Sequence, residues 1–502
     1  MSARITLQPL GTSFDVPSGT PLQDHLFSHG VEFPCGGRGR CKGCRIRVIA
    51  GSLPVTPAQE QMLSAEELSA GWRLACQCAA TSDLTIELAQ WEAAILADDS
   101  TFPFSPREGY GIAVDVGTTT IVAQLLDCTR GVVLAVRSAL NQQARFGADI
   151  MSRIGYAVVD HGHSTLVRTL RKQIETMIGE LLEAASVPAD QVMEVVLVGN
   201  TVMHHLFCDR DLEPLSQYPF ISGALGEGRF TPDTLGWKLP GGIVVRFLPC
   251  IAGFVGSDVL AGIFATRLHE HETVNVLVDL GTNGEIVIGN RGRLITTSTA
   301  AGPAFEGARI SMGMRAVTGA ISEVHRDGKG LVCHVLGNVR PRGICGSGIV
   351  DAAAALLDIG TLKANGRLPD GDVELAGPVR LTQTDIRELQ LAKGAIAAGV
   401  RILARMYGVS PEQISRVYLA GAFGNYVNTT SARRTGLLSF PGHIVTPAGN
   451  TALQGAKIAL FTPPEVFSSL ASRIEHVGLS EQPDFQDIYC EEMGFPQPAD
   501  RE

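Results

Sequence analysis

Four cysteines near the start of the chain restrict its fold more than any other feature. Cys35, Cys41 and Cys44 lie on one glycine-rich stretch and Cys76 follows at a distance, which gives the spacing C-x5-C-x2-C-x31-C. Three thiolates on a tight loop and a fourth from afar are the ligands that a 2Fe-2S cluster requires. A structural zinc site is the alternative, but zinc loops usually pair their cysteines as two separate C-x2-C units. We therefore expect these four cysteines to hold a 2Fe-2S cluster.

The segments around the cysteines predict a β-grasp fold. The alternation of apolar and polar residues and the helix-capping pattern predict strands at 4–7, 12–16, 44–48 and 83–88 and a short helix, capped by Thr20, at 21–27. This order resembles a 2Fe-2S ferredoxin, and the longer first gap between the cysteines matches the vertebrate type. We expect a ferredoxin domain over residues 1–90 and a linker over residues 91–109, which contains two prolines.

Composition narrows the functional classes. The 502 residues allow about three domains. The net charge of −10 and the lack of a basic block argue against a nucleic-acid partner. The other seven of the 11 cysteines are scattered singly through apolar segments, which favours a reducing cytoplasm over a disulfide framework. Neither a secretory leader nor an apolar run of about eighteen residues is visible, so we expect no membrane partner.

A strand, a Gly-Thr turn and a second strand follow the linker. Residues 111–116 end in Asp115 and Val116, the turn contains Gly117, Thr118 and Thr119, and 121–126 forms the second strand. Backbone N–H groups and hydroxyls of such a turn suit phosphate oxygens, and Asp115 suits Mg²⁺ or its water. One such hairpin is a weak signal, because Asp-x-Gly turns join many strands.

A second copy of the same pattern strengthens the prediction. Residues 276–280 lead through Asp279 to the turn Gly281, Thr282 and Asn283, and residues 284–288 form the returning strand. Two strand-Asp-x-Gly-Thr-strand hairpins, about 165 residues apart in the sequence, indicate a duplicated fold that closes on one nucleotide.

These hairpins resemble those of the ATPase superfamily of actin, hexokinase and the heat-shock chaperones, which is built from two RNase-H-like α/β domains. The remaining parts of that pattern have counterparts here. Residues 417–425 look like the adenosine motif with Gly421 and Gly424, and the small-residue-rich stretches 252–261 and 449–456 look like the two hinge helices. The resemblance implies a first lobe over residues 110–270 and a second lobe, with the adenosine motif, over residues 271–495.

A ferredoxin joined to such an ATPase resembles the reductive activators of corrinoid proteins, over essentially the whole chain. The family's characteristic stretches are visible at 147–154, 198–201, 248–256, 298–307, 343–348 and 385–393. Cys250 stands where the family often has Asn after Leu-Pro, which leaves the role of that position open.

The resemblance implies an ATP-hydrolysing one-electron reductase. It would return a corrinoid protein or corrinoid-dependent methyltransferase from Co(II) to Co(I) through the 2Fe-2S cluster, using ATP and Mg²⁺. An external reductase or ferredoxin would supply the electron, and a homodimer is compatible with the sequence. The alternatives are an activator of another low-potential enzyme and a nucleotide-gated redox sensor; a small-molecule kinase would leave the ferredoxin without a purpose.

Site residues follow from the same resemblance. Asp115 and Asp279 are expected to hold Mg²⁺ and the attacking water. Glu306 either orients that water or a metal ligand or is a carboxylate at a helix N-terminus. Gly302, in the same stretch, is counted among the cofactor-binding residues. Ser298 either reaches the partner's cobalt or forms a loop hydrogen bond.

Four further residues carry structural expectations. Cys78 is expected to pack as a free thiol rather than compete for the iron. Cys345 is expected to be a small residue in a tight turn rather than a cluster ligand. His204 and His205 are adjacent on an apolar helix and cannot share one helical face, so one is expected in the core and the other at the surface.

Overall fold

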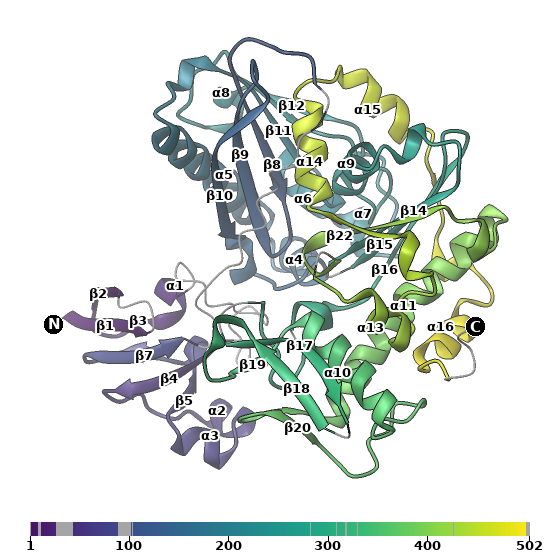
Figure 1. The fold of residues 1–502 in the computed structure, drawn as a ribbon. Helices are drawn as coiled ribbons and strands as arrows, with labels where there is room; N and C mark the ends of the chain where they lie inside the picture. The colour runs from purple at the N-terminus through teal and green to yellow at the C-terminus, as the bar shows by residue number, and fades with distance from the viewer. Residues whose placement is uncertain are drawn as a thin grey trace.

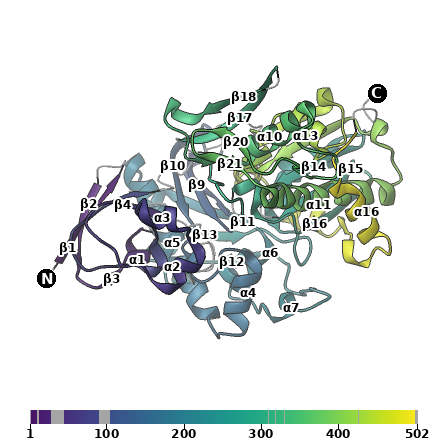
Figure 2. The ribbon, with the colours of Figure 1, turned by 90° about the horizontal axis from the view of Figure 1, so that it is seen from below.

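Three sheets carry the architecture of the chain (Figure 1). The computed structural model describes residues 2–8, 12–26, 44–88, 102, 104–281, 283–307, 309–316, 319–328, 330–424 and 426–497. The N-terminal sheet belongs to a small domain beside two larger lobes. Seen from below, this domain lies at one end of the molecule, and the helices α11 (Gln383–Tyr407) and α16 (Phe485–Met493) lie at the other (Figure 2).

The N-terminal domain is the β-grasp fold that the sequence predicts. Its mixed sheet has the order β2-β1-β7-β4-β5, and a short pair, β3 with β6, lies beside it. The strands are β1 (Ser2–Gln8), β2 (Thr12–Pro17), β3 (Thr20–Pro21), β4 (Arg45–Ala50), β5 (Trp72–Leu74), β6 (Ala79–Ala80) and β7 (Leu84–Leu88), and the helix is α1 (Leu22–Leu26). Ile5, Ile46, Leu74 and Ile86 meet in its core.

Two details of this domain differ from the prediction. Thr20 does not cap α1: it pairs with Ala80 in the β3–β6 bridge, and its hydroxyl donates to Pro17 O at 2.6 Å. Two further helices, α2 (Pro57–Met62) and α3 (Ala65–Ser69), were not predicted. Both are short, and the Ser64 cap of α3 is the local signal that indicates one of them.

The first lobe is a six-stranded sheet of order β10-β9-β8-β11-β13-β12. The strands β8 (Tyr110–Val116), β9 (Thr120–Asp127) and β10 (Val132–Leu140) form an antiparallel meander, after which β11 (Val192–Gly199) and β13 (Val244–Phe247) run parallel to β8. The edge is β12 (Gly228–Phe230), and the helices are α4 (Ile150–Val158), α5 (His163–Ala185), α6 (Thr201–Cys208), α7 (Glu213–Ser216) and α8 (Pro232–Leu235).

The second lobe repeats that topology. Its sheet has the order β23-β22-β14-β15-β16-β24, with a meander of β14 (Asn275–Leu280), β15 (Gly284–Gly289) and β16 (Leu294–Thr299). Strands β22 (Arg416–Ala420) and β23 (Val445–Gly449) then run parallel to β14. In both lobes the three meander strands and the two strands parallel to them lie in the same order across the sheet: third, second and first meander strand, then the first and second parallel strand. This is the duplication that the two hairpins predict.

The remaining elements assigned to the second lobe by sequence are β17 (Ala320–Asp327), β18 (Gly330–Val335), β19 (Gly343–Ile344), α10 (Gly346–Ile359), β20 (Val373–Ala376), β21 (Val379–Leu381), α11 (Gln383–Tyr407), α12 (Gly421–Gly424), α13 (Thr429–Thr435), α15 (Pro464–Ala471), β24 (Glu475–His476) and α16 (Phe485–Met493). They do not stay together: β19 lies beside the N-terminal domain, whereas α11 and α16 lie at the opposite end of the molecule (Figure 2). Arg342, before β19, lies 3.7 Å from Glu87 of β7, an ion pair between the lobe and the domain.

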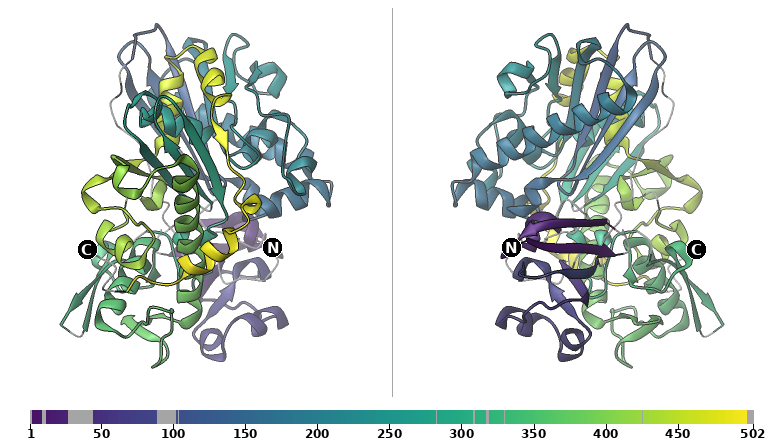
Figure 3. Two further views of the ribbon diagram at one scale, coloured as in Figure 1. Left: turned by 90° about the vertical axis from the view of Figure 1, so that its right-hand side faces the viewer. Right: turned by 90° about the vertical axis from the view of Figure 1, so that its left-hand side faces the viewer.

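Two helices cross closely between the lobes, as predicted. They are α9 (Ser257–Ala265) and α14 (Thr451–Ala459), which lies in the upper lobe although its residues come late in the chain (Figure 3). A Cβ on Gly455 would lie 2.2 Å from Ala261 O, so only glycine allows this crossing. The helix in the first stretch begins at Ser257, because residues 252–255 form a turn closed by the Ala252–Val255 bridge.

No helix within the described part of the chain is both long and apolar enough to span a membrane.

Candidate functional site

The first hairpin turn meets the second lobe through side chains that the sequence places far apart. Asn450 Nδ2 donates to Asp115 Oδ2 at 3.0 Å, and Thr119 Oγ1 donates to Glu306 Oε2 at 3.4 Å. Asp115 and Asp279 both stand one residue before the end of the first strand of their meander. The predicted residues of both lobes therefore line one interlobe region.

Carboxylates gather in this region, and burial changes their acidity. Burial raises the pKa of Asp115 to about 7; the Asn450 hydrogen bond opposes this, and the charge of Asp258 adds to it. Burial, then the charges of Asp258 and Asp115, raises the pKa of Asp279 to about 7. Burial, then the charges of Asp258 and Asp279, raises the pKa of Glu285 well above its ordinary value. Each charged carboxylate therefore destabilises the others.

Asp258 and Glu285 were not singled out from the sequence. Asp258 lies in the first turn of α9, and burial raises its pKa to about 6. Glu285 pairs with Asp279 across β14 and β15 and accepts a hydrogen bond from Ser298 Oγ at 3.3 Å. An acid at the start of an otherwise apolar, small-residue helix was the available signal for Asp258.

This donor set fits a hard divalent cation. Carboxylate oxygens are the ligands that Mg²⁺ prefers, and a cation would relieve the repulsion that raises these pKa values. The carboxylates do not form a finished cage: within the described ranges, no three His, Cys, Asp or Glu side chains stand close enough to hold a metal ion. Mg²⁺ commonly keeps several waters and binds through one or two carboxylates together with phosphates.

Three polar side chains, of which Asn141 and Arg153 are buried, fix the first turn. Asn141 Nδ2 donates to Gly117 O at 2.9 Å, and Asn200 Nδ2 donates to Thr118 Oγ1 at 2.8 Å. Arg153, which is fully buried, donates through Nη2 to Thr118 O. Asn200 and Arg153 lie in two of the characteristic stretches, and the structure gives them the role of positioning the turn.

The second turn is described in part. Thr282 lies outside the described residues, whereas Gly281 N donates to Asn283 O at 3.1 Å and closes the turn. Asn283 faces the cleft described below.

The glycines of the predicted adenosine motif have close backbone neighbours. Gly421 has φ +83°, and a Cβ there would lie 2.7 Å from Asp279 Oδ1 and from Leu280 O. A Cβ on Gly424 would lie 3.2 Å from the carbonyl carbon of Leu419. The turn after β22 therefore packs directly on the end of β14, and contact with adenosine stays a prediction.

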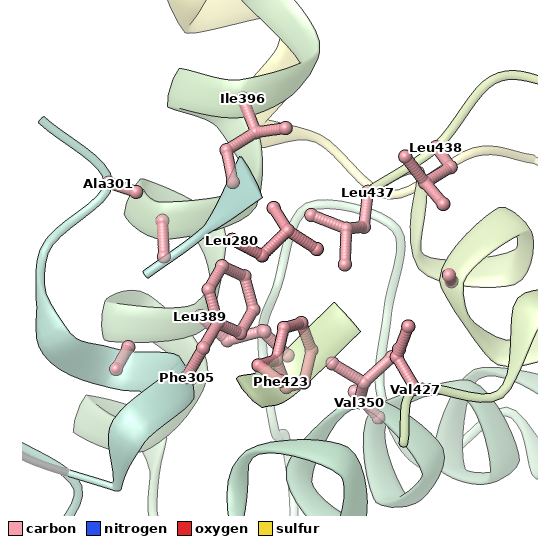
Figure 4. Packing of buried hydrophobic residues seen from close by; sticks show 14 of the residues in the cluster. Leu280, Ala301, Phe305, Val350, Leu389, Ile396, Phe423, Val427, Leu437 and Leu438 are labelled. Atoms are coloured by element: carbon pink, nitrogen blue, oxygen red, sulfur yellow. The ribbon is translucent and has the colours of Figure 1, made fainter. Parts of the chain in front are cut away.

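One hydrophobic core lies behind this turn. The ring of Phe423, from α12, stacks on Phe305, with centroids 4.5 Å apart and planes 14° apart. Leu280 from the end of β14 and Leu389 and Ile396 from α11 surround the pair (Figure 4). The core thus joins the turn after β22, the end of β14 and the segment that carries Glu306.

A cleft of about 2150 Å³ opens from the hairpin turns towards the ferredoxin domain. All three modules contribute to its lining, which includes Trp72, Thr119, Tyr218, Asn283, Ser298 and Glu306. Tyr218 and Ile221 expose 65% and 69% of their surface, so apolar groups face solvent at its edge. Gly302, at φ +76°, precedes a 3-10 turn of residues Pro303–Glu306 in which Glu306 is the last residue.

Two of the four predicted cluster ligands are described. Cys44 directly precedes β4, and Cys76 lies in a 3-10 turn after β5. Ala75 N donates to Cys44 O at 3.0 Å, which brings these two ligands to adjacent turns, as a cluster requires. Cys35 and Cys41 lie outside the described residues.

Cys78 and Cys345 are both buried, and the expectation that neither binds iron stays a prediction. Cys78 is buried and free, its Sγ lies 3.7 Å from Gln59 Nε2, and burial raises the pKa of its thiol to about 11. Cys345 is buried, immediately precedes α10 and contacts Ser347 Oγ at 3.3 Å, as expected of a small residue in a tight turn.

The prediction for the adjacent histidines is wrong in one respect, because both are fully buried. His204 Nε2 lies 3.1 Å from Gly226 O, and His205 Nε2 lies 2.7 Å from Ser222 Oγ. Burial lowers the pKa of His204 to about 3 and that of His205 to about 4. The loop that carries Ser222 and Gly226 covers the face of α6 that we expected to be exposed to solvent.

Comparison with known proteins yields consistent family matches. Residues 5–81 match a 2Fe-2S iron-sulfur cluster binding domain, residues 110–271 match the RACo middle region, and residues 273–501 match the C-terminal domain of RACo, the ASKHA domain.

Individual relatives agree with these matches. The chain is 35% identical over 418 residues, 76% of this chain and 69% of the relative, to the corrinoid activation enzyme RamQ of Eubacterium limosum. It is 26% identical to the Co(II) methylated amine-specific corrinoid protein reductase of Methanosarcina barkeri, over 77% of each chain. Among solved structures, a reductive activator for a corrinoid, iron-sulfur protein matches 99% of this chain and 98% of its own, with 27% identity and a TM-score of 0.69.

Proposed function

The chain belongs to the family of reductive activators of corrinoid proteins, and on this premise we propose that it uses ATP to return a Co(II) corrinoid protein to Co(I) by one-electron reduction. The single observation that carries the proposal is the shared cleft. The ferredoxin domain and both ATPase lobes line one cavity, so that a partner bound there contacts the electron-carrying module and the nucleotide-binding module together.

ATP and Mg²⁺ are the proposed cofactors of the two lobes. The Gly117–Thr119 and Gly281–Asn283 turns would hold phosphate oxygens, Asp115 and Asp279 would hold Mg²⁺ or its water, and Gly421 and Gly424 would lie near the adenosine. A bound cation supplies positive charge that favours ionised carboxylates, and ATP binding supplies free energy for lobe closure. The polar clamp of Asn141, Arg153 and Asn200 on the first turn supports this proposal.

Thiolates of Cys35, Cys41, Cys44 and Cys76 would hold the 2Fe-2S cluster, which supplies one electron when it is reduced. On the same domain, Trp72 and Arg45 face the cleft, with the Arg45 guanidinium 5.6 Å from the centre of the Trp72 ring. Each shortfall of about 59 mV between donor and acceptor costs about 1.4 kcal/mol for one electron. Different affinities of ATP and partner for the open and closed lobes would offset that cost.

Glu306 would orient the attacking water, and its contact with Thr119 across the lobes supports this role. Ser298 would approach a partner's cobalt; its position in the lining of the cleft supports this role, and its hydroxyl donates to Glu285. We also propose an external reductase or ferredoxin as electron donor, a cytoplasmic location and, as the sequence allows, a homodimer. None of the nine described cysteines forms a disulfide with another described cysteine, which supports a reducing compartment.

The test is anaerobic reduction of a Co(II) corrinoid methyltransferase protein, followed in the visible spectrum with and without ATP and Mg²⁺. We expect Co(I) only with ATP, and its loss in Cys41→Ser and Asp279→Ala. Asp327→Ala is the matched control, because Asp327 is an exposed carboxylate on the β17–β18 hairpin, and it should behave as wild type. Absence of Co(I) with several corrinoid partners, despite an intact cluster and ATP hydrolysis, would favour another low-potential enzyme as the partner.

A further inference from the structure

Residues 309–314, here the cleft loop, form one wall of the cleft. All six residues line it, from Arg309 to Met314. The loop folds back on itself, because Gly313 N donates to Ile310 O at 3.0 Å and a Cβ on Gly313 would lie 1.9 Å from Gly307 O. It directly follows the turn that ends in Glu306, so its shape and the position of that carboxylate are linked.

Among the described residues, backbone hydrogen bonds to β19 hold only the C-terminal part of the cleft loop. Met314 N donates to Ile344 O and Ile344 N donates to Met312 O, both at 2.9 Å. These bonds fasten the loop to β19. These backbone bonds do not include Ser311, which is held by a side chain instead.

Asp385 holds Ser311. Its carboxylate, which is fully buried, accepts hydrogen bonds from Ser311 N and from Ser311 Oγ, both at 2.6 Å. The same carboxylate accepts from Thr382 N and Thr382 Oγ1, both at 2.9 Å, at the start of α11. A buried carboxylate with four donors is a strong anchor, because hydrogen bonds to a charged group are stronger than those between neutral groups.

The helix that carries this anchor also supports the second hairpin. Ile396 of α11 packs under Gly284, where an added Cβ would lie 2.9 Å from Ile396 Cγ1. Leu389, between Asp385 and Ile396 on the same helix, lies in the core with Phe305 (Figure 4). Helix α11 therefore contacts the cleft loop through Asp385 and the strand after the proposed phosphate turn through Ile396.

We propose that Asp385 is a positioning residue for the corrinoid protein: it fixes the cleft loop, through Ser311, in the shape that the partner binds. The inference rests on the proposed function and adds to it the residue that preforms the partner's binding wall. Without the carboxylate the loop must be ordered at the moment of binding, which costs affinity. The residue acts through the loop and touches neither nucleotide nor cobalt.

Helix capping alone is the competing role for Asp385, and the chain offers a matched control for it. Thr382 caps α11, because its Oγ1 accepts from Asp385 N at 3.2 Å. Thr382→Ala removes this cap and leaves both Ser311 hydrogen bonds in place. In Asp385→Asn an NH₂ group replaces either Oδ1, which accepts from Ser311 N, or Oδ2, which accepts from Ser311 Oγ and from Thr382, so either orientation loses at least one acceptor for Ser311. Ser311→Ala removes one loop bond and leaves the cap intact.

The experiment measures the initial rate of Co(I) formation against the concentration of a Co(II) corrinoid methyltransferase protein, using the full chain with its cluster loaded. Thermal melting is recorded for each variant. We expect Asp385→Asn to raise the half-saturating partner concentration about tenfold, equivalent to about 1.4 kcal/mol, with little change in maximal rate. Ser311→Ala should raise the half-saturating partner concentration less. Thr382→Ala should lower the melting temperature and leave the half-saturating partner concentration unchanged.

Direct binding of the Co(II) protein in the absence of ATP gives a second readout, which does not depend on turnover. Equal half-saturation and equal binding for Asp385→Asn and Thr382→Ala would overturn the inference and leave the proposed function intact. A wild-type chain that neither binds nor reduces the Co(II) protein would overturn both.

Discussion

Asn450 holds two parts of the molecule with one side chain. Its Nδ2 donates to Asp115 Oδ2 at 3.0 Å, 335 residues away in sequence, and its Oδ1 accepts from Leu453 N at 2.8 Å as the cap of α14. The start of the hinge helix is thereby joined to the end of the first phosphate strand. A movement of α14 would therefore change the hydrogen bond to Asp115, the carboxylate that we propose to bind Mg²⁺.

Asn450→Ala should shift the pH dependence of ATP hydrolysis upwards. The Asn450 hydrogen bond lowers the pKa of Asp115, so its removal raises that pKa further above 7 and delays ionisation to higher pH. Rates measured at saturating Mg²⁺ across pH 6–9 test this. Asn428→Ala is the control, because Asn428 caps α13 in the same manner and makes no hydrogen bond to a carboxylate of the described residues. An unchanged profile in Asn450→Ala would contradict the role.

Asp279→Asn should stabilise the nucleotide-free, Mg²⁺-free protein at high pH. The folded-state pKa of Asp279, about 7, exceeds the ordinary 3.8, so the folded state binds the proton more tightly than the unfolded state. This group's contribution to stability is complete below about pH 4 and is lost as pH rises through about 7. The neutral amide avoids that loss, and we expect a gain on the order of 1–2 kcal/mol at pH 8.

Denaturant titrations at pH 5 and pH 8 measure this difference. The gain over wild type should appear at pH 8 and shrink at pH 5, where Asp279 is protonated. Added Mg²⁺ and nucleotide should favour wild type over the variant. An equal gain at both pH values would mean that repulsion among the carboxylates is not its cause.

Phe423→Leu should weaken the effect of ATP on partner binding. The Phe305–Phe423 stack connects the predicted adenosine turn to the segment of Glu306, and such a pair is worth about 0.5–1.5 kcal/mol beyond burial. The ratio of partner dissociation constants with and without ATP should move towards one by severalfold. Phe146→Leu, which disrupts the stack with Tyr156 in the first lobe, should cost stability and leave the ratio unchanged.

Gly455→Ala should separate the two hinge helices. The added Cβ would lie 2.2 Å from Ala261 O, a contact that only a backbone shift relieves, and such overpacking costs about 1–3 kcal/mol. We expect a lower melting temperature and slower ATP hydrolysis. Gly179→Ala, on α5 with nothing within 4 Å of the added carbon, should instead be neutral or stabilising. Equal melting temperatures for the two variants would show that the crossing tolerates a side chain.

The sequence predicts those parts of the site that are local in the chain. Each of the two hairpins is a strand, a turn and a strand within about twenty residues, and the strands of both were placed correctly, whereas phosphate binding by their turns stays a prediction. The positioning residues were not assigned, because their partners are distant: Asp385 and Ser311 are 74 residues apart, and Arg153 and Thr118 are 35 apart. The surface prediction for one of the two adjacent histidines failed for the same reason, since helical periodicity contains no information about the loop that covers α6.

The position of the ferredoxin domain has a consequence for the order of events in turnover. Trp72 and Arg45, beside two of the expected cluster ligands, form part of the wall of the cleft in which we place the partner. A docked partner would cover that side of the domain. A donor protein using the same side would therefore have to reduce the cluster before the partner arrives, so that loading and delivery alternate and each docking carries a single electron.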